Sequence, residues 1–266
     1  MVIKMHKINL DKTEIRTDLV MEQEIDKKID KIIEKNKHIE VTETSIERNH
    51  YTTIKFNDIT DKDNFEIVQN HFIKELKKYL NLKKEDKFIV IGLGNDKSTP
   101  DSLGPLTVNN ILVTRHLFLL GDVEEGYSNV SSFIPNVMGN TGIETAEIIK
   151  SIVEKINPTK VIIIDSLKTN NLSRLAKTIQ ITDQGISPGS GIGNKRKEIS
   201  KNTINKEVIA IGIPMVVDIK NIINTKESMI VTPTNIDFLV EKLSILIGNG
   251  INISLHKNFF RQNNKQ

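Results

Sequence analysis

The stretch FIVIGLGNDKSTPDSLGP, residues 88–105, combines an apolar run, a glycine-rich turn and a helix start. Residues 88–91 are aromatic and β-branched, which is typical of a buried strand, and the glycines that follow allow a tight turn. Pro100 disfavours helical geometry at the residue before it, so Asp101 is expected to be the N-cap of a helix that runs to about residue 115. In an open α/β sheet this position faces the ligand crevice, although an Asp here could serve only as a cap.

A second apolar strand also ends in an aspartate. Residues 161–164 are all β-branched, which is typical of a central parallel strand, and Asp165 follows them. A strand, a crossover helix and a parallel strand place both strand ends on one edge of the sheet, so Asp101 and Asp165 are expected to face one crevice. Asp183 and Asp218 also follow predicted strands, and the pattern alone does not choose among the four carboxylates.

Two carboxylates at close range have a defined chemical use. Their mutual repulsion separates their pKa values, so one can act as a base for water while the other stays protonated as an acid. This pairing suits hydrolysis of an amide bond without a metal or another cofactor.

Composition excludes several other classes of chemistry. The chain of 266 residues has no cysteine, which excludes disulfides, thiolate nucleophiles and zinc sites built on cysteine. The net charge of +3 arises from interspersed basic and acidic residues and gives no reason to expect direct nucleic-acid contact. No apolar run approaches a membrane span, and the N-terminus lacks the apolar core of a secretory signal. We expect a soluble cytoplasmic protein that does not contact a membrane.

The rest of the chain predicts one α/β domain preceded by a polar arm. The isoleucines of residues 21–35 have helical spacing, and residues 39–58 alternate as two strands would. The other expected elements are a helix from Asn64 to residue 80, a strand at 117–122, a long loop at 126–142, a helix capped by Thr141, strands at 178–182 and 208–217, and a helix after residue 233.

The segment GISPGSGIGNKRK, residues 185–197, is rich in glycine but misses both phosphate-binding templates. Asn194 stands where the phosphate-binding loop needs glycine before lysine, and the spacing fails the dinucleotide fingerprint. A role for its N–H groups in binding an oxyanion or the substrate backbone, with Lys195 or Arg196 nearby, remains open.

Several long phrases together resemble the germination proteases of spore-forming bacteria. They are GLGNDKSTPDSLGP (92–105), TRHLF (114–118), VMGNTGIETAEI (137–148), VIIIDSL (161–167), TIQITDQGISPGSGIGNKR (178–196), VIAIGIPMVVD (208–218) and MIVTPTNID (229–237). The resemblance implies an endopeptidase that degrades small acid-soluble spore proteins during germination. It also implies a homotetrameric zymogen, made in the forespore and kept in the spore core, that removes its own propeptide.

The same resemblance implies which residues are catalytic. The family's two catalytic aspartates correspond to Asp101 and Asp165, and which of them is the base is not implied. The sequence TEIRTDL, residues 13–19, resembles the propeptide junction, so residues 1–18 are expected to be the arm and residues 19–266 the peptidase domain. The exact cleaved bond stays open.

The implied fold is similar to that of hydrogenase-maturation proteases. It has three layers with a mostly parallel central sheet flanked by helices, here with a small N-terminal α+β lobe. Because those enzymes use a metal held by carboxylates and a histidine, a metal-dependent endopeptidase is an alternative. His116 is the histidine closest in sequence to Asp101. It lies at the end of the helix expected there, where its position favours a structural role over metal binding.

Some positions depart from the family pattern. Ser166, Lys168, Met215 and Asn136 replace the usual residues, and only residues 219–228 separate the VVD and VTP phrases. A lysine beside a catalytic carboxylate would lower the pKa of that carboxylate. The chain is therefore either a compact protease or a non-catalytic relative that keeps the scaffold.

Overall fold

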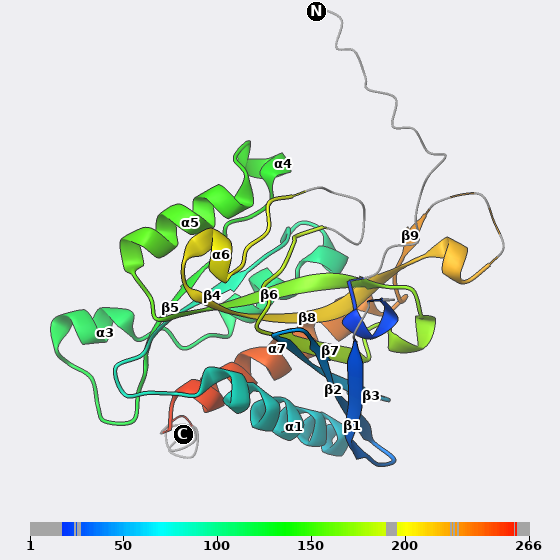
Figure 1. The fold of residues 1–266 in the computed structure, drawn as a ribbon, viewed down its shortest axis with the longest axis horizontal. Coiled ribbons are helices and arrows are strands. Elements are labelled where there is room, and N and C mark those ends of the chain that lie inside the picture. Colours follow the sequence, from blue (N-terminus) through cyan, green and yellow to red (C-terminus); the bar gives the residue numbers. More distant parts are fainter. Residues whose placement is uncertain are drawn as a thin grey trace, which may run out of the picture.

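The computed structural model describes residues 18–23, 25, 28–189, 196–223, 225, 227, 229–257 and 259. One mixed sheet lies between two helical layers (Figure 1), which confirms the predicted α/β class. Its strand order is β1-β2-β3-β7-β8-β6-β4-β5, and β9 pairs with β8. The strands are β1 Ile29–Lys35, β2 Ile39–Ile46, β3 Asn49–Phe56, β4 Lys87–Gly92, β5 Asn129–Phe133, β6 Lys160–Thr169, β7 Thr178–Thr182, β8 Glu207–Asp218 and β9 Ile230–Val231.

Helices cover both faces of this sheet (Figure 1). The α-helices are α1 Lys62–Leu80, α2 Leu103–Asn109, α3 Arg115–Leu120, α4 Met138–Thr141, α5 Thr145–Ile156, α6 Lys201–Ile204 and α7 Ile236–Leu255. The short 3₁₀ helices used below are η2 Val20–Glu22, η3 Thr99–Asp101, η4 Leu172–Arg174 and η6 Ile219–Asn221.

The parallel half of the sheet places the two aspartate-bearing segments side by side. Strands β8, β6, β4 and β5 are parallel neighbours, and Gly92 at the end of β4 is in register with Ile164 of β6. The carboxyl end of β4 therefore lies one residue from Asp165, as the strand and crossover pattern predicts.

The N-terminal strands continue this sheet instead of forming a separate lobe. Strand β3 pairs antiparallel with β7, with Tyr51 opposite Thr182, and β1 and β2 extend the sheet further. The sheet is therefore mixed rather than mostly parallel. Strand β3 has a partner strand on each edge, and both of its faces are largely buried, as in an inner strand of a covered sheet.

The helix predicted for residues 21–35 is wrong. The structure has η2 followed by strand β1, whose Ile29 pairs with Ser45 of β2. Ile29 and Ile32 are 67% and 58% exposed, so their helical spacing marks no buried helix face. β-branched residues suit an edge strand equally well, and only the partner strand decides between the two.

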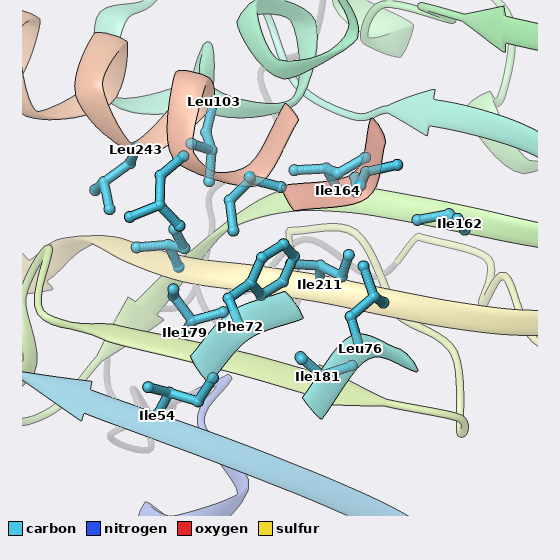
Figure 2. Packing of buried hydrophobic residues seen from close by; sticks show 14 of the residues in the cluster. Ile54, Phe72, Leu76, Leu103, Ile162, Ile164, Ile179, Ile181, Ile211 and Leu243 are labelled. Carbon is cyan, nitrogen blue, oxygen red and sulfur yellow. The ribbon is translucent and has the colours of Figure 1, made fainter. Parts of the chain in front are cut away.

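A large apolar core fills the layer between the sheet and helices α1, α2 and α7 (Figure 2). Phe72 of α1, Leu103 of α2 and Leu243 of α7 pack over Ile162 and Ile164 of β6. On the other face, alternate residues of the same strands pack on α5 and α6 in a second core. Strand β6 is thus buried on both sides, which explains its continuous apolar sequence.

Helix α7 is long and apolar enough to cross a membrane, by length and composition. Within this fold, however, 61% of its apolar window is buried, and it packs against α1 and α2. These properties are those of a core helix in a soluble protein.

Several boundaries, most of them between residues 101 and 145, differ from the expected ones. The strand predicted at 117–122 is helix α3, and the predicted loop at 126–142 contains β5 and α4. The N-cap of α5 is Glu144 rather than Thr141, and that of α1 is Asp61 rather than Asn64. Strand β5, with the sequence NVSSF, carries too few apolar residues to stand out, because it is an edge strand that pairs only with β4.

Candidate active site

Three glycines let η3 approach the end of β4. A Cβ atom at Gly94 would lie 1.9 Å from the carbonyl oxygen of Asp101, and one at Gly92 would lie 2.2 Å from the carbonyl oxygen of Gly104. The Asn95 N–H donates to the Asp101 carbonyl oxygen at 3.0 Å. Asp101 is therefore the last residue of η3 and not the predicted N-cap, because Ser102 is the residue before α2.

Asp165 lies within β6 and is 6% exposed. Its Oδ1 accepts a hydrogen bond from the Ser166 N–H at 2.9 Å. By strand alternation its side chain is on the same face as Ile163, toward α5. The residue opposite it on β8 is Gly212, where an added Cβ would lie 2.4 Å from Leu167 Cδ1.

The two predicted aspartates are electrostatically coupled. Burial raises the pKa of Asp165 well above its usual value, and the charges of Asp101 and Asp18 raise it further. Burial also raises the pKa of Asp101 to about 6, against a smaller lowering by the Asn95 N–H. Both carboxyl groups therefore hold protons at a pH where ordinary aspartates are ionised.

Asp165 opens into a cavity of about 280 Å³ on the α5 side of the sheet. The small residues Ala210 and Gly212 form part of its floor, and Gln180 and Thr182 of β7 extend it. A larger cavity of about 1220 Å³ lies at the opposite edge, beside the first residues of β6 and β8, and contains neither aspartate of the pair. The smaller cavity is the one associated with the predicted chemistry.

Residues 18–23, which we call the strap, contribute Asp18, Val20 and Gln23 to the lining of this cavity. Of these residues, the sequence predicts only Asp18 to belong to the arm. Asp18 and Lys168 exchange two hydrogen bonds: the Asp18 N–H donates to the Lys168 carbonyl at 3.0 Å, and the Lys168 N–H donates to Asp18 Oδ2 at 2.8 Å. The Val20 N–H donates to Gln180 Oε1 at 2.8 Å. Leu19 and Val20 are almost wholly buried.

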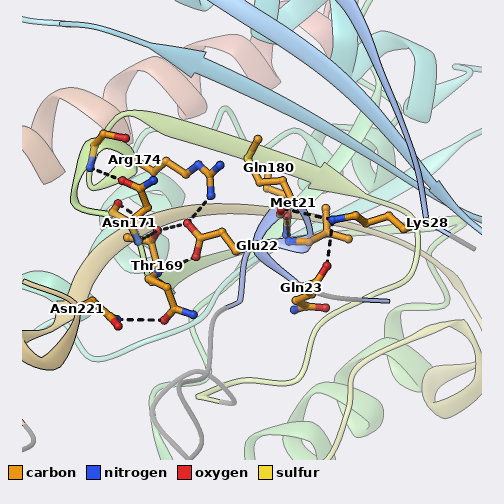
Figure 3. A network of polar contacts seen from close by, with 12 residues as sticks. Met21, Glu22, Gln23, Lys28, Thr169, Asn171, Arg174, Gln180 and Asn221 are labelled. Atoms are coloured by element: carbon orange, nitrogen blue, oxygen red, sulfur yellow. Dashed lines mark hydrogen bonds and ion pairs between the residues drawn. The ribbon is translucent and has the colours of Figure 1, made fainter. Parts of the chain in front are cut away.

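Glu22 anchors the far end of the strap (Figure 3). Its carboxylate accepts from Thr169 Oγ1 at 2.5 Å, from the Asn170 N–H at 2.7 Å and from Arg174 Nη1 at 2.7 Å. The Glu22 side chain is only 5% exposed. In sequence this pairing has no signal, because Glu22 and Arg174 are 152 residues apart.

We expect Glu22→Gln to lower the free energy of unfolding by about 1–3 kcal/mol, because Arg174 loses its charged partner and the NH2 group that replaces one carboxylate oxygen cannot accept a hydrogen bond. Urea unfolding measures this change. Glu147→Gln, which breaks the exposed pair of Glu147 with Lys197, is the matched control and should have no measurable effect. Equal losses in the two variants would contradict the anchoring role.

Lys168 does not have the predicted effect on Asp165. Its ammonium lies 3.6 Å from the Asp218 carboxylate, and it is separated from Asp165 by the alternation of the strand. The pKa of Asp165 is raised rather than lowered. Asp183 accepts a hydrogen bond from the His50 N–H beside the larger cavity, so of the four strand-end aspartates the structure couples Asp101 with Asp165.

His116 lies at another position in the fold than expected, and part of the glycine-rich segment is outside the described residues. His116 is exposed and begins α3 instead of ending the helix after Asp101. Within the described residues, no three His, Asp or Glu side chains are grouped as a metal site would require. Residues 190–195, including Lys195, lie outside the described residues, and Arg196 pairs with Glu144 at 3.7 Å.

Comparison with known proteins gives consistent matches. A family model described as germination protease matches residues 2–228. A germination protease from Geobacillus sp. (strain WCH70) is 46% identical over 229 residues, which cover 81% of this chain and 58% of that protein. One from Bacillus cereus (strain B4264) is 41% identical over 262 residues, with coverage of 88% and 69%. The chain thus spans about three fifths to two thirds of the length of these relatives.

Among solved structures, a [NiFe] hydrogenase maturation protease HycI from Thermococcus kodakarensis KOD1 matches with a TM-score of 0.39 and 16% sequence identity. The match covers 66% of this chain and 98% of that one. The family assignment rests on the sequence matches, which include the segments that carry Asp101 and Asp165. The chain belongs to the germination protease family.

Proposed function

We propose that the protein is an endopeptidase that degrades small acid-soluble spore proteins during spore germination. Its family membership supports the substrate class, and its relatives are described as germination proteases. The observation that carries the chemistry is the coupling of Asp101 and Asp165, two carboxyl groups from separate segments whose pKa values are both raised. Carboxyl groups with separated pKa values can divide the roles of acid and base.

We assign the acid role to Asp165 and the base role to Asp101. Asp165 is more deeply buried and its pKa is raised further, so it keeps its proton when Asp101 is ionised. Asp101 accepts a proton from water as the water oxygen attacks the scissile carbonyl carbon. Asp165 then donates its proton to the amide nitrogen as the C–N bond breaks, which releases an amine and a carboxylic acid. Asp165 regains its proton and Asp101 loses the one it accepted before the next cycle, by transfer between them directly or through solvent.

The protein is further proposed to be a zymogen of the forespore and spore core that removes its own N-terminal arm. Support comes from residues 13–19, which resemble the family's propeptide junction, and from the strap, which leads the chain directly to the cavity beside Asp165. Residues 1–17 of the arm lie outside the described residues.

Self-association, expected as a homotetramer, has a candidate surface on β1, where Ile29 and Ile32 are largely exposed. We expect Ile29→Thr with Ile32→Thr to reduce the assembled mass in sedimentation while stability stays within about 0.5 kcal/mol, because threonine also suits a strand. Leu120→Gln, on exposed α3 near the opposite edge of the sheet, is the control. An unchanged assembly in the β1 variant would place the self-contact elsewhere.

The proposed activity is tested by incubating the purified chain of residues 1–266 with an acid-soluble spore protein, with and without a chelator. Asp101→Asn and Asp165→Asn serve as paired variants. Chelator-resistant cleavage that both variants lose supports the aspartate mechanism. Chelator-sensitive cleavage supports a metal-dependent peptidase instead, and a folded, assembled chain without any cleavage supports a non-catalytic relative.

A further inference from the structure

We propose that the larger cavity is a second binding site for the substrate polypeptide, which takes up an extended segment several residues away from the cleaved bond. The part of this cavity beside residues 207–209 of β8 receives the segment, and we call it the slot. This inference deepens the proposed endopeptidase function and rests on it.

The slot is a gap in the sheet next to β8. Strand β7 pairs with β8 only over residues 180–182. Beyond them the chain stays beside β3, where the Asp183 N–H donates to the His50 carbonyl oxygen at 3.4 Å and Asp183 Oδ1 accepts from the His50 N–H at 2.9 Å. Among the described residues, no strand therefore pairs with residues 207–209 on the side of β8 that faces away from β6.

This open edge of β8 offers unpaired backbone groups. The N–H and C=O groups of successive strand residues point alternately to the two sides of the strand, so at least one of residues 207–209 directs both groups into the slot. An extended chain laid beside such an edge gains main-chain hydrogen bonds, as in peptide binding by strand addition. The edge is only three residues long, which limits its pairing with another folded sheet.

Polar bonds fix the walls of the slot before any ligand binds. Lys160, whose side chain is only 8% exposed, donates from Nζ to the Leu80 carbonyl oxygen at 2.5 Å and lies 3.2 Å from the Glu207 carboxylate. The Tyr79 hydroxyl donates to the Ile181 carbonyl oxygen at 3.3 Å. These contacts tie the end of α1 to β6 and β7 and hold the first residue of β8, so binding requires little reordering of the protein.

The size and lining of the larger cavity fit a polypeptide better than a small molecule. Its volume of about 1220 Å³ lies above the usual range of small-molecule pockets, about 300–1,000 Å³. Its lining comes from α1 and α6, which lie on opposite faces of the sheet (Figure 1), and carries charges of both signs, such as Arg48, Glu198 and Lys201. A peptide backbone, which is polar at every residue, matches such a lining.

The slot leads to the smaller cavity, which contains Asp165. Three residues line both cavities: Tyr51, Gln184 and Glu198. Val208 in the slot is four residues before Gly212, which is opposite Asp165. Four residues of β-strand span about 13 Å, and an extended peptide covers this distance in about four residues. The slot therefore holds substrate residues that are about four or more positions from the cleaved bond.

The test compares a long and a short peptide on the chain of residues 1–266. Mass spectrometry first locates the bond that is cleaved in an acid-soluble spore protein. The long peptide extends about eight residues to each side of this bond, and the short one about two, which is too short to reach the slot. Ser45→Trp on β2 and Asn202→Trp on α6 obstruct the larger cavity from two separate elements, and Ser151→Trp on the exposed surface of α5 is the matched control.

We expect the wild type to have a KM about tenfold lower for the long peptide than for the short one, because the slot binds the ground state and the transition state alike. Each obstructing variant should raise KM for the long peptide to that of the short one, with kcat within about twofold. Ser151→Trp should change neither value. Equal KM values for the two peptides in the wild type, which needs no variant to fold, or a long-peptide KM that neither obstructing variant raises, would overturn the proposal.

A binding measurement separates this proposal from the activity itself. If the wild-type chain cleaves nothing, the proposed function fails, and fluorescence anisotropy of the labelled, intact spore protein then tests the slot. Binding that both obstructing variants weaken about tenfold supports the slot in a non-catalytic relative. Absence of binding to the wild type, or equal binding to the wild type and both variants, overturns it.

Discussion

Asp165→Asn should lower the cleavage rate by about 10²–10⁴-fold and at the same time stabilise the folded protein at pH 7. The rate falls because the amide cannot donate the proton that the leaving nitrogen needs. Stability rises because burial and two neighbouring negative charges oppose ionisation of the native carboxyl group, whereas the amide carries no charge.

The size of the stabilisation by Asp165→Asn depends on pH, because the raised pKa of Asp165 affects the free energy of unfolding only in part of the pH range. Below the unfolded pKa of about 4, Asp165 is protonated in both the folded and unfolded chain, and its raised pKa has no effect on stability. Above that pH the unfolded chain releases its proton while the folded chain retains it, so stability falls as the pH rises toward the folded pKa. The stabilisation by Asn should therefore be small near pH 4 and grow toward pH 7.

Thermal unfolding of both forms across this pH range measures the effect. Asp101→Asn should also raise the free energy of unfolding. The gain should grow only between about pH 4 and about pH 6 and reach at most about 3 kcal/mol, because the pKa of Asp101 is raised to about 6. Asp58→Asn is the control of opposite sign, because hydrogen bonds from Thr60 lower the pKa of Asp58. A stabilisation by Asp165→Asn that is independent of pH would refute the electrostatic account.

Gly94→Ala should reduce cleavage by at least about 100-fold and lower the free energy of unfolding by about 3 kcal/mol or more. Gly94 has φ of +111°, which L residues rarely adopt, and its added Cβ would lie 1.9 Å from the backbone oxygen of Asp101. The collision involves backbone on both sides, so it can be relieved only by moving η3 away from β4. Such a movement displaces Asp101 from Asp165.

Gly121→Ala separates collision from backbone strain. Gly121 also has a positive φ, of +72°, but a methyl group added there, at the surface end of α3, would meet nothing within 4 Å. We expect it to lose about 1 kcal/mol in unfolding and to retain full cleavage. If both alanine variants lose stability and activity equally, close packing of η3 is not what places Asp101.

How far the sequence predicts the structure differs between the central strands and the edge strands of the sheet. The apolar runs that become β4 and β6 are continuous and buried on both faces, so their patterns indicate central strands and place Asp101 and Asp165 at the same edge. Strand β1 has no buried face, and its isoleucines satisfy helical spacing by coincidence. Strand β5 is a polar edge strand. Its sequence also lacks the pattern of a buried strand, so it predicts a loop.

The surroundings of the aspartate pair were less accessible from sequence. The strap lies at the cavity through bonds from Asp18 to Lys168 and from Glu22 to Arg174, each spanning about 150 residues. No local pattern encodes such contacts. The resemblance indicated that residues near 18 matter, but it assigned Asp18 to the arm.

The sequence by itself predicted the α/β class and four strand-end aspartates, because local runs of apolar residues, glycines and strand ends have consequences that follow from short-range geometry. Its long shared phrases indicated the family and, through that resemblance, Asp101 and Asp165 as the catalytic candidates. Only the tertiary structure decided that the N-terminal strands extend the central sheet, that Lys168 pairs with Asp218, and that Asp18 shares the cavity of Asp165. Those outcomes depend on which distant backbone groups and charges meet, and burial at their meeting point sets their strength.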